Sequence, residues 1–368
     1  MRSLPVTELD RLFKALATDG FDVIGPTVRD GGIVVDRLAA PDVLPWGWTA
    51  HHEPGRFDLQ RAGRTAFAVV HGADGWKRWL YPPRQRLWTA EINGDAAPTI
   101  NGEPAPLAPM AFVGVRGCDL AAIAKFDRVM MGAVEPDPIY VTRRRGLFVV
   151  AVDCAQPAST CFCASFATGP SVIEGFDLRL TEIDDERGHR FLVAAAGDRA
   201  RAIVDALDLK PADDVDADAR ATQGRRAEAA MGRGLSTEGL PERLRAARES
   251  KHFDAVAERC LACANCTMVC PTCFCTTVHD QTDLAGHRVE RHRQWDSCFT
   301  LGFSYVHGGP VREGESARYR QWLLHKLQTW HDQFGGSGCV GCGRCITWCP
   351  AGIDIVAEAE ALCAEGRT

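Results

Sequence analysis

The sequence predicts an α+β protein, with an N-terminal α/β-type domain followed by a helix-rich, cysteine-rich C-terminal domain. Three observations lead to this prediction. Short apolar runs alternate with helical patterns through the first half of the chain. From Glu242 onward, helical patterns dominate. Twelve of the sixteen cysteines lie between residues 260 and 363, whereas residues 1–117 contain none.

The bulk composition limits the class of protein. A chain of 368 residues is long enough for two domains of ordinary size, and a hydrophobic share of 46% is enough to build a core. The net charge of −6 argues against a nucleic-acid partner, which would require a basic face. The longest apolar runs are the size of strands, so the sequence predicts no membrane span.

The N-terminus predicts an amphipathic helix. Apolar side chains recur there at helical spacing, at Leu9, Leu12, Phe13 and Leu16. Asp19-Gly20 follows as a stop signal, and the segment lacks the pattern of a secretory signal peptide. We therefore expect a cytoplasmic protein. Because the cytoplasm is reducing, the cysteines are expected to be metal ligands or catalytic thiols rather than disulfides.

The first domain is expected to span residues 1–225. Apolar runs between Pro- and Gly-rich turns predict strands at residues 33–35, 67–70, 112–115, 147–152 and 191–195. Helices are predicted over Leu120–Met131 and Arg199–Leu207. The polar segment Lys210–Arg225 has no apolar periodicity, so we expect a linker or an exposed loop there.

The second domain is expected to span residues 226–368. Its clearest helix is predicted over Glu315–Phe334, where large apolar side chains share one face and Gly335-Gly336 ends the pattern. The same domain carries the duplicated cysteine motif, which is the strongest functional signal in the chain.

Two cysteine runs share one spacing. The first is Cys260-x2-Cys263-x2-Cys266-x3-Cys270-Pro271, and the second is Cys339-x2-Cys342-x2-Cys345-x3-Cys349-Pro350. Both match the run C-x2-C-x2-C-x3-C-P of bacterial ferredoxins, in which the fourth cysteine binds the other cluster. The spacing therefore predicts two [4Fe–4S] clusters with crossed ligand sets: Cys260, Cys263, Cys266 and Cys349 for the first cluster, and Cys339, Cys342, Cys345 and Cys270 for the second.

A pair of zinc sites is the alternative interpretation of these cysteines. Zinc prefers two C-x2-C pairs separated by a longer loop, whereas each run here has three closely spaced thiols and a Cys-Pro. The pattern therefore favours iron–sulfur clusters, whose assembly would be coupled to folding. The 68 residues between Cys270 and Cys339 make the arrangement resemble the α-helical ferredoxins of succinate dehydrogenase and heterodisulfide reductase, rather than compact hairpin ferredoxins.

Eight cysteines lie outside these two ligand sets. Four follow predicted strands and could hold a third [4Fe–4S] cluster at one edge of the sheet: Cys118, Cys154, Cys161 and Cys163. Buried packing is the alternative, because Cys-x-Cys is not a standard cluster spacing. The others are expected to pack around a cluster, with a ligand role as the alternative: Cys273, Cys275, Cys298 and Cys363.

The sequence offers no catalytic constellation of its own. Gly232-Arg-Gly234 follows no strand, and neither a P-loop nor an H-E-x-x-H motif occurs. No nucleophile–base pair can be argued, so we predict no catalytic residue and leave open whether the chain is itself an enzyme. A chain with clusters but no substrate site would need partners at both ends.

Several further segments together carry a family resemblance. They are Gly25–Gly31, Leu44–Gly47, Trp76-Lys77, Tyr81–Pro83, Gly114–Asp119, Trp295–Cys298 and the second cysteine run. The chain resembles the iron–sulfur (beta) subunits of cytosolic sulfhydrogenase-type, NAD(P)-linked [NiFe] hydrogenases. It is also similar to the iron–sulfur subunits of anaerobic sulfite reductases.

The resemblance implies an electron-transfer subunit of an oxidoreductase complex. Its partners would be a hydrogenase small subunit together with a flavin subunit that uses NAD(P)H. The alternative is an iron–sulfur subunit of a sulfite or sulfur reductase, which this chain alone does not separate from the first. Two other hypotheses are a self-contained reductase with a substrate at Cys118 and Cys154, and a zinc-stabilised scaffold.

Overall fold

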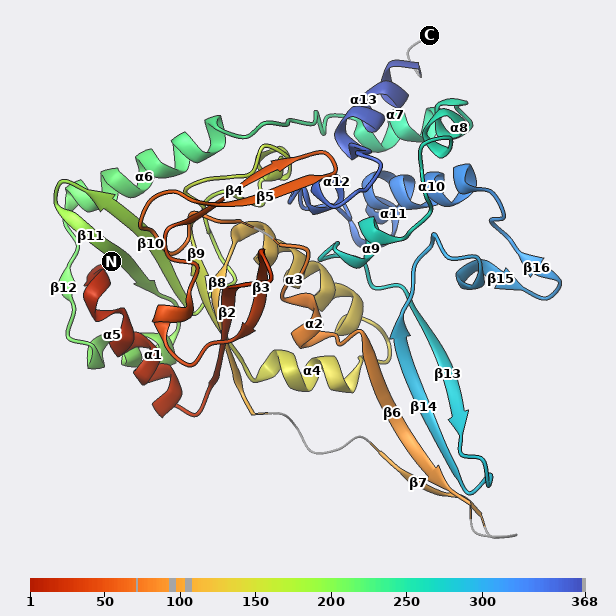
Figure 1. Cartoon of the computed structure of the whole chain (residues 1–368), viewed down its shortest axis with the longest axis horizontal. Helices are drawn as coiled ribbons and strands as arrows, with labels where there is room; N and C mark the ends of the chain where they lie inside the picture. Colours follow the sequence, from red (N-terminus) through yellow and green to blue (C-terminus); the bar gives the residue numbers. More distant parts are fainter. Residues whose placement is uncertain (71, 93–96, 103–107, 366–368) are drawn as a thin grey trace.

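The computed structural model describes residues 1–70, 72–92, 97–102 and 108–365. Within these residues, the strands form an eight-stranded mixed sheet, a four-stranded sheet and two small hairpins, and a group of short helices lies in the C-terminal part (Figure 1). The protein is thus a mixed helix-and-strand fold, as the sequence predicts. None of the helices in the described ranges is both long and apolar enough to cross a membrane.

The large sheet is parallel in its centre and antiparallel at its sides. In order, its strands are β12 (Lys210–Pro211), β1 (Arg2–Pro5), β11 (Gly188–Ala195), β10 (Leu178–Asp185), β9 (Leu147–Val152), β8 (Met110–Val115), β2 (Asp22–Arg29) and β3 (Gly32–Arg37). Strands β10, β9, β8 and β2 run parallel to one another. Every residue of β8 is buried, because both faces of a parallel sheet are covered and the strand is therefore apolar throughout.

Helices cover the two faces of this sheet. On one face, α1 (Leu9–Thr18) and α5 (Asp198–Ala206) pack in one apolar cluster with Val113 and Val150. On the other face, α3 (Gly117–Met130) and α4 (Pro138–Arg145) pack with Phe112 and Val149. Neighbouring strand residues thus join opposite clusters, as the two-residue period of a strand requires. The helices predicted at 120–131 and 199–207 correspond to α3 and α5.

The expected strand at residues 67–70 is absent, and a buried loop stands in its place. Side chains form the hydrogen bonds with the backbone of this loop that a neighbouring strand would otherwise form. The Glu182 carboxylate accepts hydrogen bonds from the backbone N–H groups of Ala66 and Phe67, at 2.7 and 2.8 Å. The Arg116 guanidinium donates to the carbonyls of Phe67 and Val69 at 2.6 and 2.8 Å. The prediction was wrong because these partners are distant in sequence.

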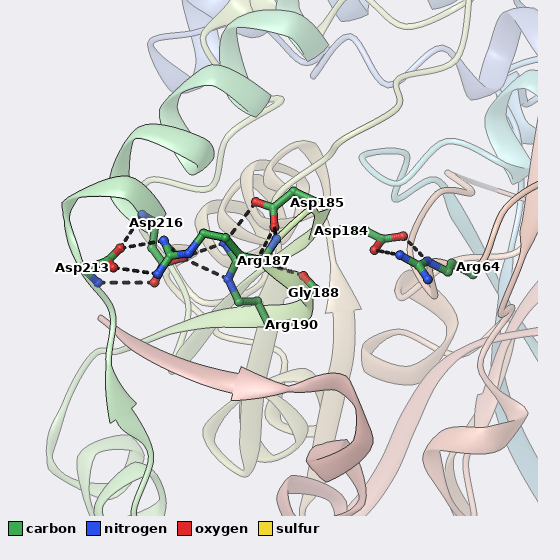
Figure 2. A network of polar contacts seen from close by, with 8 residues as sticks. All are labelled: Arg64, Asp184, Asp185, Arg187, Gly188, Arg190, Asp213 and Asp216. Atoms are coloured by element: carbon green, nitrogen blue, oxygen red, sulfur yellow. Dashed lines mark hydrogen bonds and ion pairs between the residues drawn. The ribbon is translucent and has the colours of Figure 1, made fainter.

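The expected linker at Lys210–Arg225 is also wrong, because most of it lies in helix α6 (Asp214–Ala229). Asp213 and Asp216 form a capping box at its start. Figure 2 shows how two arginines hold this end: Arg187 of the β10–β11 turn bonds Asp213 at 2.7 Å, and Arg190 of β11 bonds Asp216 at 2.8 Å. Caps and ion pairs, rather than an apolar stripe, support this polar helix, so hydrophobic periodicity could not reveal it.

The four-stranded sheet forms an arm that extends from the rest of the molecule (Figure 1). Its order is β13 (Thr276–Thr282), β14 (Arg288–Trp295), β6 (Arg84–Glu91) and β7 (Thr99–Asn101). It therefore pairs strands from both sides of residue 225. Two smaller hairpins pair β4 (Trp48–Glu53) with β5 (Arg56–Arg61), and β15 (Tyr305–Val306) with β16 (Gly309–Pro310). The helix-rich part of the chain is thus not wholly helical.

Short helices are spread along the C-terminal part. They are α7 (Leu240–Ala246), α8 (His252–Ala257), α9 (Asn265–Met268), α10 (Glu315–Leu324), α11 (Trp330–Phe334), α12 (Arg344–Thr347) and α13 (Ile355–Glu365). A π-helical turn, His325–Thr329, joins α10 to α11. The helix predicted over Glu315–Phe334 is therefore present, with one widened turn in its middle. Elsewhere, α2 (Lys77–Leu80) packs beside α4.

Candidate metal centre

The first cysteine run lies along a loop that leads into α9 and borders a cavity of about 420 Å³. The cysteines of the cavity wall are Cys260, Cys263, Cys266, Cys345 and Cys349. Aromatic side chains close the rest of it, among them Phe299, Tyr319 and Trp322. Cys349 belongs to the second run, so the last thiol of that run faces the cavity of the first.

The second run borders a cavity of about 350 Å³. Its wall contains Cys339, Cys342 and Cys345, and Cys270 comes to it from the first run. Cys345 lines both cavities, so they share a wall. The structure thus brings together both crossed sets of four cysteines.

The two cysteine loops have the same backbone shape. Ala262 and Ala264 of the first loop have φ of 48° and 65°, and Gly341 and Gly343 occupy the equivalent positions of the second with φ of 65° and 73°. These left-handed residues turn the chain so that backbone N–H groups face sulfur: Ala262 donates to Cys260 at 3.4 Å, and Gly341 donates to Cys339 at 3.3 Å. Hydrogen bonds of this kind help set the potential of a bound cluster.

The donor sets suit iron–sulfur cubanes. Burial raises the pKa of Cys339 to about 12, and burial also raises the pKa of Cys266. Buried thiols of this kind become thiolates when a metal cation compensates the cost of desolvation. Among the residues the structure describes, no three cysteine, histidine or acidic side chains converge closely enough to share a single ion. A cubane sets its thiolates farther apart, because each binds a different iron corner.

A buried lysine faces the second cavity, and sequence analysis missed it. Lys326 lies in the π-helical turn with 3% of its surface exposed, and its ammonium donates to Thr272 Oγ1 at 2.6 Å. Burial opposes its charge, but the thiols of Cys270 and Cys273 raise the pKa of Lys326 above its ordinary value. The Lys326 carbonyl also accepts the Gly338 N–H at 2.7 Å, which anchors the segment before Cys339.

The four cysteines of the middle of the chain also converge, beside the second loop. Cys118 starts α3, directly after β8, and Cys154 follows β9, so both lie at the carboxyl ends of parallel strands as expected. Burial raises the pKa of Cys161, and the nearby Cys154 and Cys163 raise it further. Cys118 and Cys163 share an apolar cluster with Cys342. The middle cysteines are thus in contact with the cysteine loop that borders the second cavity.

Close packing joins these cysteines to the second loop. The backbone N–H of Phe162 donates to the Gly341 carbonyl at 2.8 Å. A Cβ added at Gly341 would lie 2.5 Å from the Phe162 carbonyl oxygen, and one at Gly343 would lie 2.4 Å from that of Thr160. The second loop therefore needs glycine where the first loop has alanine. The reason is this neighbouring segment, which the first loop lacks.

A buried ion pair crosses the same contact. Arg344, inside the second run, donates to Asp119 Oδ1 at 2.8 Å, and both side chains are 3% exposed. Trp76 Nε1 also donates to Asp119, at 3.3 Å. A charged residue inside a cysteine run was visible in the sequence, but its partner 225 positions earlier was not.

The remaining cysteines lie in three settings. Cys273 contacts Cys270 and Lys326. Cys275 and Cys298 contact each other at the base of the β13–β14 hairpin. Cys363 belongs to α13 and packs in the apolar core of the C-terminal part.

Comparison with known proteins identifies the family. Residues 259–353, which contain both cysteine runs, match the model of a 4Fe-4S dicluster domain. The chain is 33% identical over 289 residues to sulfhydrogenase 2 subunit beta of Pyrococcus furiosus, which covers 76% of this chain and 80% of that protein. The chain belongs to the sulfhydrogenase beta-subunit family. The resemblance stated from the sequence is thereby confirmed, and the C-terminal part is a dicluster domain of this family. No solved structure matches the chain.

Proposed function

We propose that this chain is a cytoplasmic electron-transfer subunit, which relays single electrons between an NAD(P)-linked flavin protein and a [NiFe] hydrogenase module. The observation that carries the proposal is the pair of cysteine-lined cavities that share Cys345 in their walls. Groups bound in adjoining cavities would be near neighbours, as rapid electron transfer requires. The relative's name, a sulfhydrogenase subunit, supports a place in a hydrogenase complex.

Each proposed ligand set combines three cysteines of one run with the last cysteine of the other. The first set is Cys260, Cys263, Cys266 and Cys349, and the second is Cys339, Cys342, Cys345 and Cys270. The walls of the two cavities support this division. The bound cubanes would supply one-electron redox chemistry. Backbone N–H groups and the buried Lys326 ammonium would stabilise their negative charge.

A third cubane is proposed at the carboxyl ends of β8 and β9. Its ligands would be Cys118, Cys154, Cys161 and Cys163, all of which are buried. Contact with the loop around Cys342 supports the proposal, because it would place the third group next to the second cluster. The chain would then carry a path from the large sheet into the dicluster domain.

The proposed division into functional parts is residues 1–225 and 226–368. An apolar cluster supports this division, because all but one of its fully buried members lie between Leu235 and Cys363, the exception being Phe162. The four-stranded arm takes strands from both parts, so we propose that the arm is shared between them.

Anaerobic purification of the native complex tests the function. We expect iron and acid-labile sulfide, an EPR signal after reduction by dithionite, and co-purification of a flavin subunit with hydrogenase subunits identified by mass spectrometry. A sirohaem protein in their place would establish the sulfite reductase alternative. Zinc in place of iron, in colourless protein, would overturn the proposal.

Iron analysis tests the third cluster separately. A chain with three cubanes holds about twelve irons, and one with two holds about eight. The double variant C118S/C154S should therefore lose about four irons and keep the rest. Cys363→Ser, which removes a buried thiol elsewhere, is the matched control and should lose none. An unchanged iron content in the double variant would refute the third cluster.

A further inference from the structure

Two cysteines that the proposed clusters do not use meet at the base of the β13–β14 hairpin. Cys275 directly precedes β13, and Cys298 lies shortly after the end of β14. The strands pair Thr276 with Trp295, and the Asp296 N–H continues this pairing by donating to the Cys275 carbonyl at 2.9 Å. The hairpin therefore holds the two cysteines opposite each other, independently of any bound group.

The two side chains lie next to each other at this base. The thiol of Cys298 is the neighbour that acts most strongly on the sulfur of Cys275, and the backbone N–H of Cys298 also acts on it. Cys298 is 8% exposed, whereas Cys275 is half-buried. The pair is thus shielded from most of the solvent, and its two sulfur atoms are already neighbours.

Two lysines surround this pair. Lys326 approaches from the π-helical turn, and Lys77 approaches from α2, where its ammonium lies 3.8 Å from the centre of the Trp295 ring. Cys298, together with Lys326 and Lys77, lowers the pKa of Cys275 to about 7 against the opposing effect of burial. One sulfur is therefore readily a thiolate while its neighbour keeps a proton, which is the arrangement that thiol–disulfide chemistry needs.

The pair also lies near both proposed clusters. Cys298 belongs to an apolar cluster against which cysteines of both ligand sets pack, among them Cys266 and Cys339. Cys275 interacts with Cys273, which contacts Cys270 of the second set. A single-ion site is not an alternative within the described residues, because no third cysteine, histidine or acidic ligand converges there.

We propose that Cys275 and Cys298 form a redox-active dithiol that stores two electrons beside the two clusters. On oxidation the two S–H bonds break and one S–S bond forms. Two protons leave to solvent, and two electrons pass one at a time to two oxidised cubanes. Reduction reverses each of these changes. The inference rests on the electron-transfer function proposed above, and it adds a two-electron, proton-coupled site to a path of one-electron carriers.

Peptide mapping of the anaerobic holoprotein tests this proposal. One sample is oxidised with a slight excess of thionine and another is reduced with dithionite. Both are quenched in acid, alkylated with N-ethylmaleimide in denaturant, and digested with trypsin. Cleavage after Arg293 separates the Cys298 peptide from the peptide that contains Cys275. We expect these two peptides to be linked in the oxidised sample only, with two fewer labelled thiols per chain.

Samples poised at a series of potentials should convert between the two forms in a two-electron step. Its midpoint should fall as pH rises, because protons leave with the electrons. C275S and C298S should each abolish the linked peptide and keep the full iron content, whereas Cys363→Ser should leave the linkage unchanged. Both thiols remaining labelled after oxidation would overturn the dithiol. Loss of iron in C298S would also overturn it, by making that cysteine a ligand. An iron-free wild-type chain would instead refute the electron-transfer function, so the two failures are distinguishable.

Discussion

The eight-stranded sheet is packed on both faces by apolar side chains, whereas the region around the two cavities is packed by thiols, aromatic rings and a buried lysine. Strands β8 and β9 are six residues each and almost fully buried. Helices α9 and α12, which follow the cysteine loops, have only four residues each. Helices this short are not stable alone in water. The sheet can therefore be held by hydrophobic burial, while the dicluster region depends on what its cysteines bind.

Removal of iron should give the largest difference in stability between the two regions. The apo chain should lose the ordered structure of residues 259–353, because cluster binding and folding of such a domain are coupled. The sheet should remain folded, because its core contains no proposed ligand of the two clusters. Hydrogen exchange with mass spectrometry measures this: amides of the dicluster domain should become unprotected while those of β9 stay protected. Equal loss of protection in both regions would show that the sheet also needs the clusters.

The buried ion pair between the regions should give the next largest effect. Asp119→Ala leaves the Arg344 guanidinium buried beside Cys342 without its carboxylate partner. Breaking a buried pair in this way costs about 3–5 kcal/mol. Urea unfolding of the anaerobic holoprotein should show the loss as a lower midpoint. Asp280→Ala removes the partner of an exposed arginine, Arg291, and should leave the midpoint unchanged. A midpoint equal to that of the wild type in D119A would show that the contact contributes no stability.

The difference between the two cysteine loops gives a smaller effect. Gly343→Ala places a Cβ 2.4 Å from the Thr160 carbonyl oxygen at a residue with φ of 73°. Strain of this kind costs about 1–3 kcal/mol. It should lower the urea midpoint and the iron content of the chain. Gly302→Ala is the matched control, because nothing lies near its added Cβ. A G343A chain with the urea midpoint and iron content of the wild type would mean that the second loop is not packed tightly against residues 160–163.

A buried histidine at the same boundary should give the smallest effect. Burial lowers the pKa of His52 to about 4, from 6.5. Below pH 6.5 the unfolded chain therefore binds a proton that the folded chain does not, and stability falls as the pH drops toward 4. Between pH 7 and 5.5 this histidine should account for about 1 kcal/mol. His325, whose pKa burial also lowers to about 4, should add a similar amount.

The pH dependence can be measured as the urea midpoint of anaerobic protein across this range. H52Q should weaken the dependence, because it removes one of the two histidines whose pKa burial lowers to about 4. The control is His307→Gln, which removes an exposed histidine that does not act on His52. A pH dependence in H52Q as steep as in the wild type would contradict the assignment.

Local patterns account for the parts of the protein that were predicted correctly. The apolar run at 147–152 gave β9 with its full bounds, because a strand covered on both faces is apolar throughout. The cysteine spacing alone indicated a dicluster domain, because the loop that wraps a cubane is built from consecutive residues. Features that depend on distant partners were missed, such as the Arg187 and Arg190 contacts that hold α6, or the carboxylate that replaces a strand at residues 66–67.

The sequence by itself determined the family, the class of cofactor and which cysteines are candidates to bind it, since each depends on residue types at fixed short spacings. Only the tertiary structure decided which cysteines share a cavity, that Lys326 and Arg344 are buried beside them, and that Cys275 meets Cys298. The physical reason is that these contacts join residues far apart in the chain. Their charges and thiols interact only after strands and helices have closed the space between them.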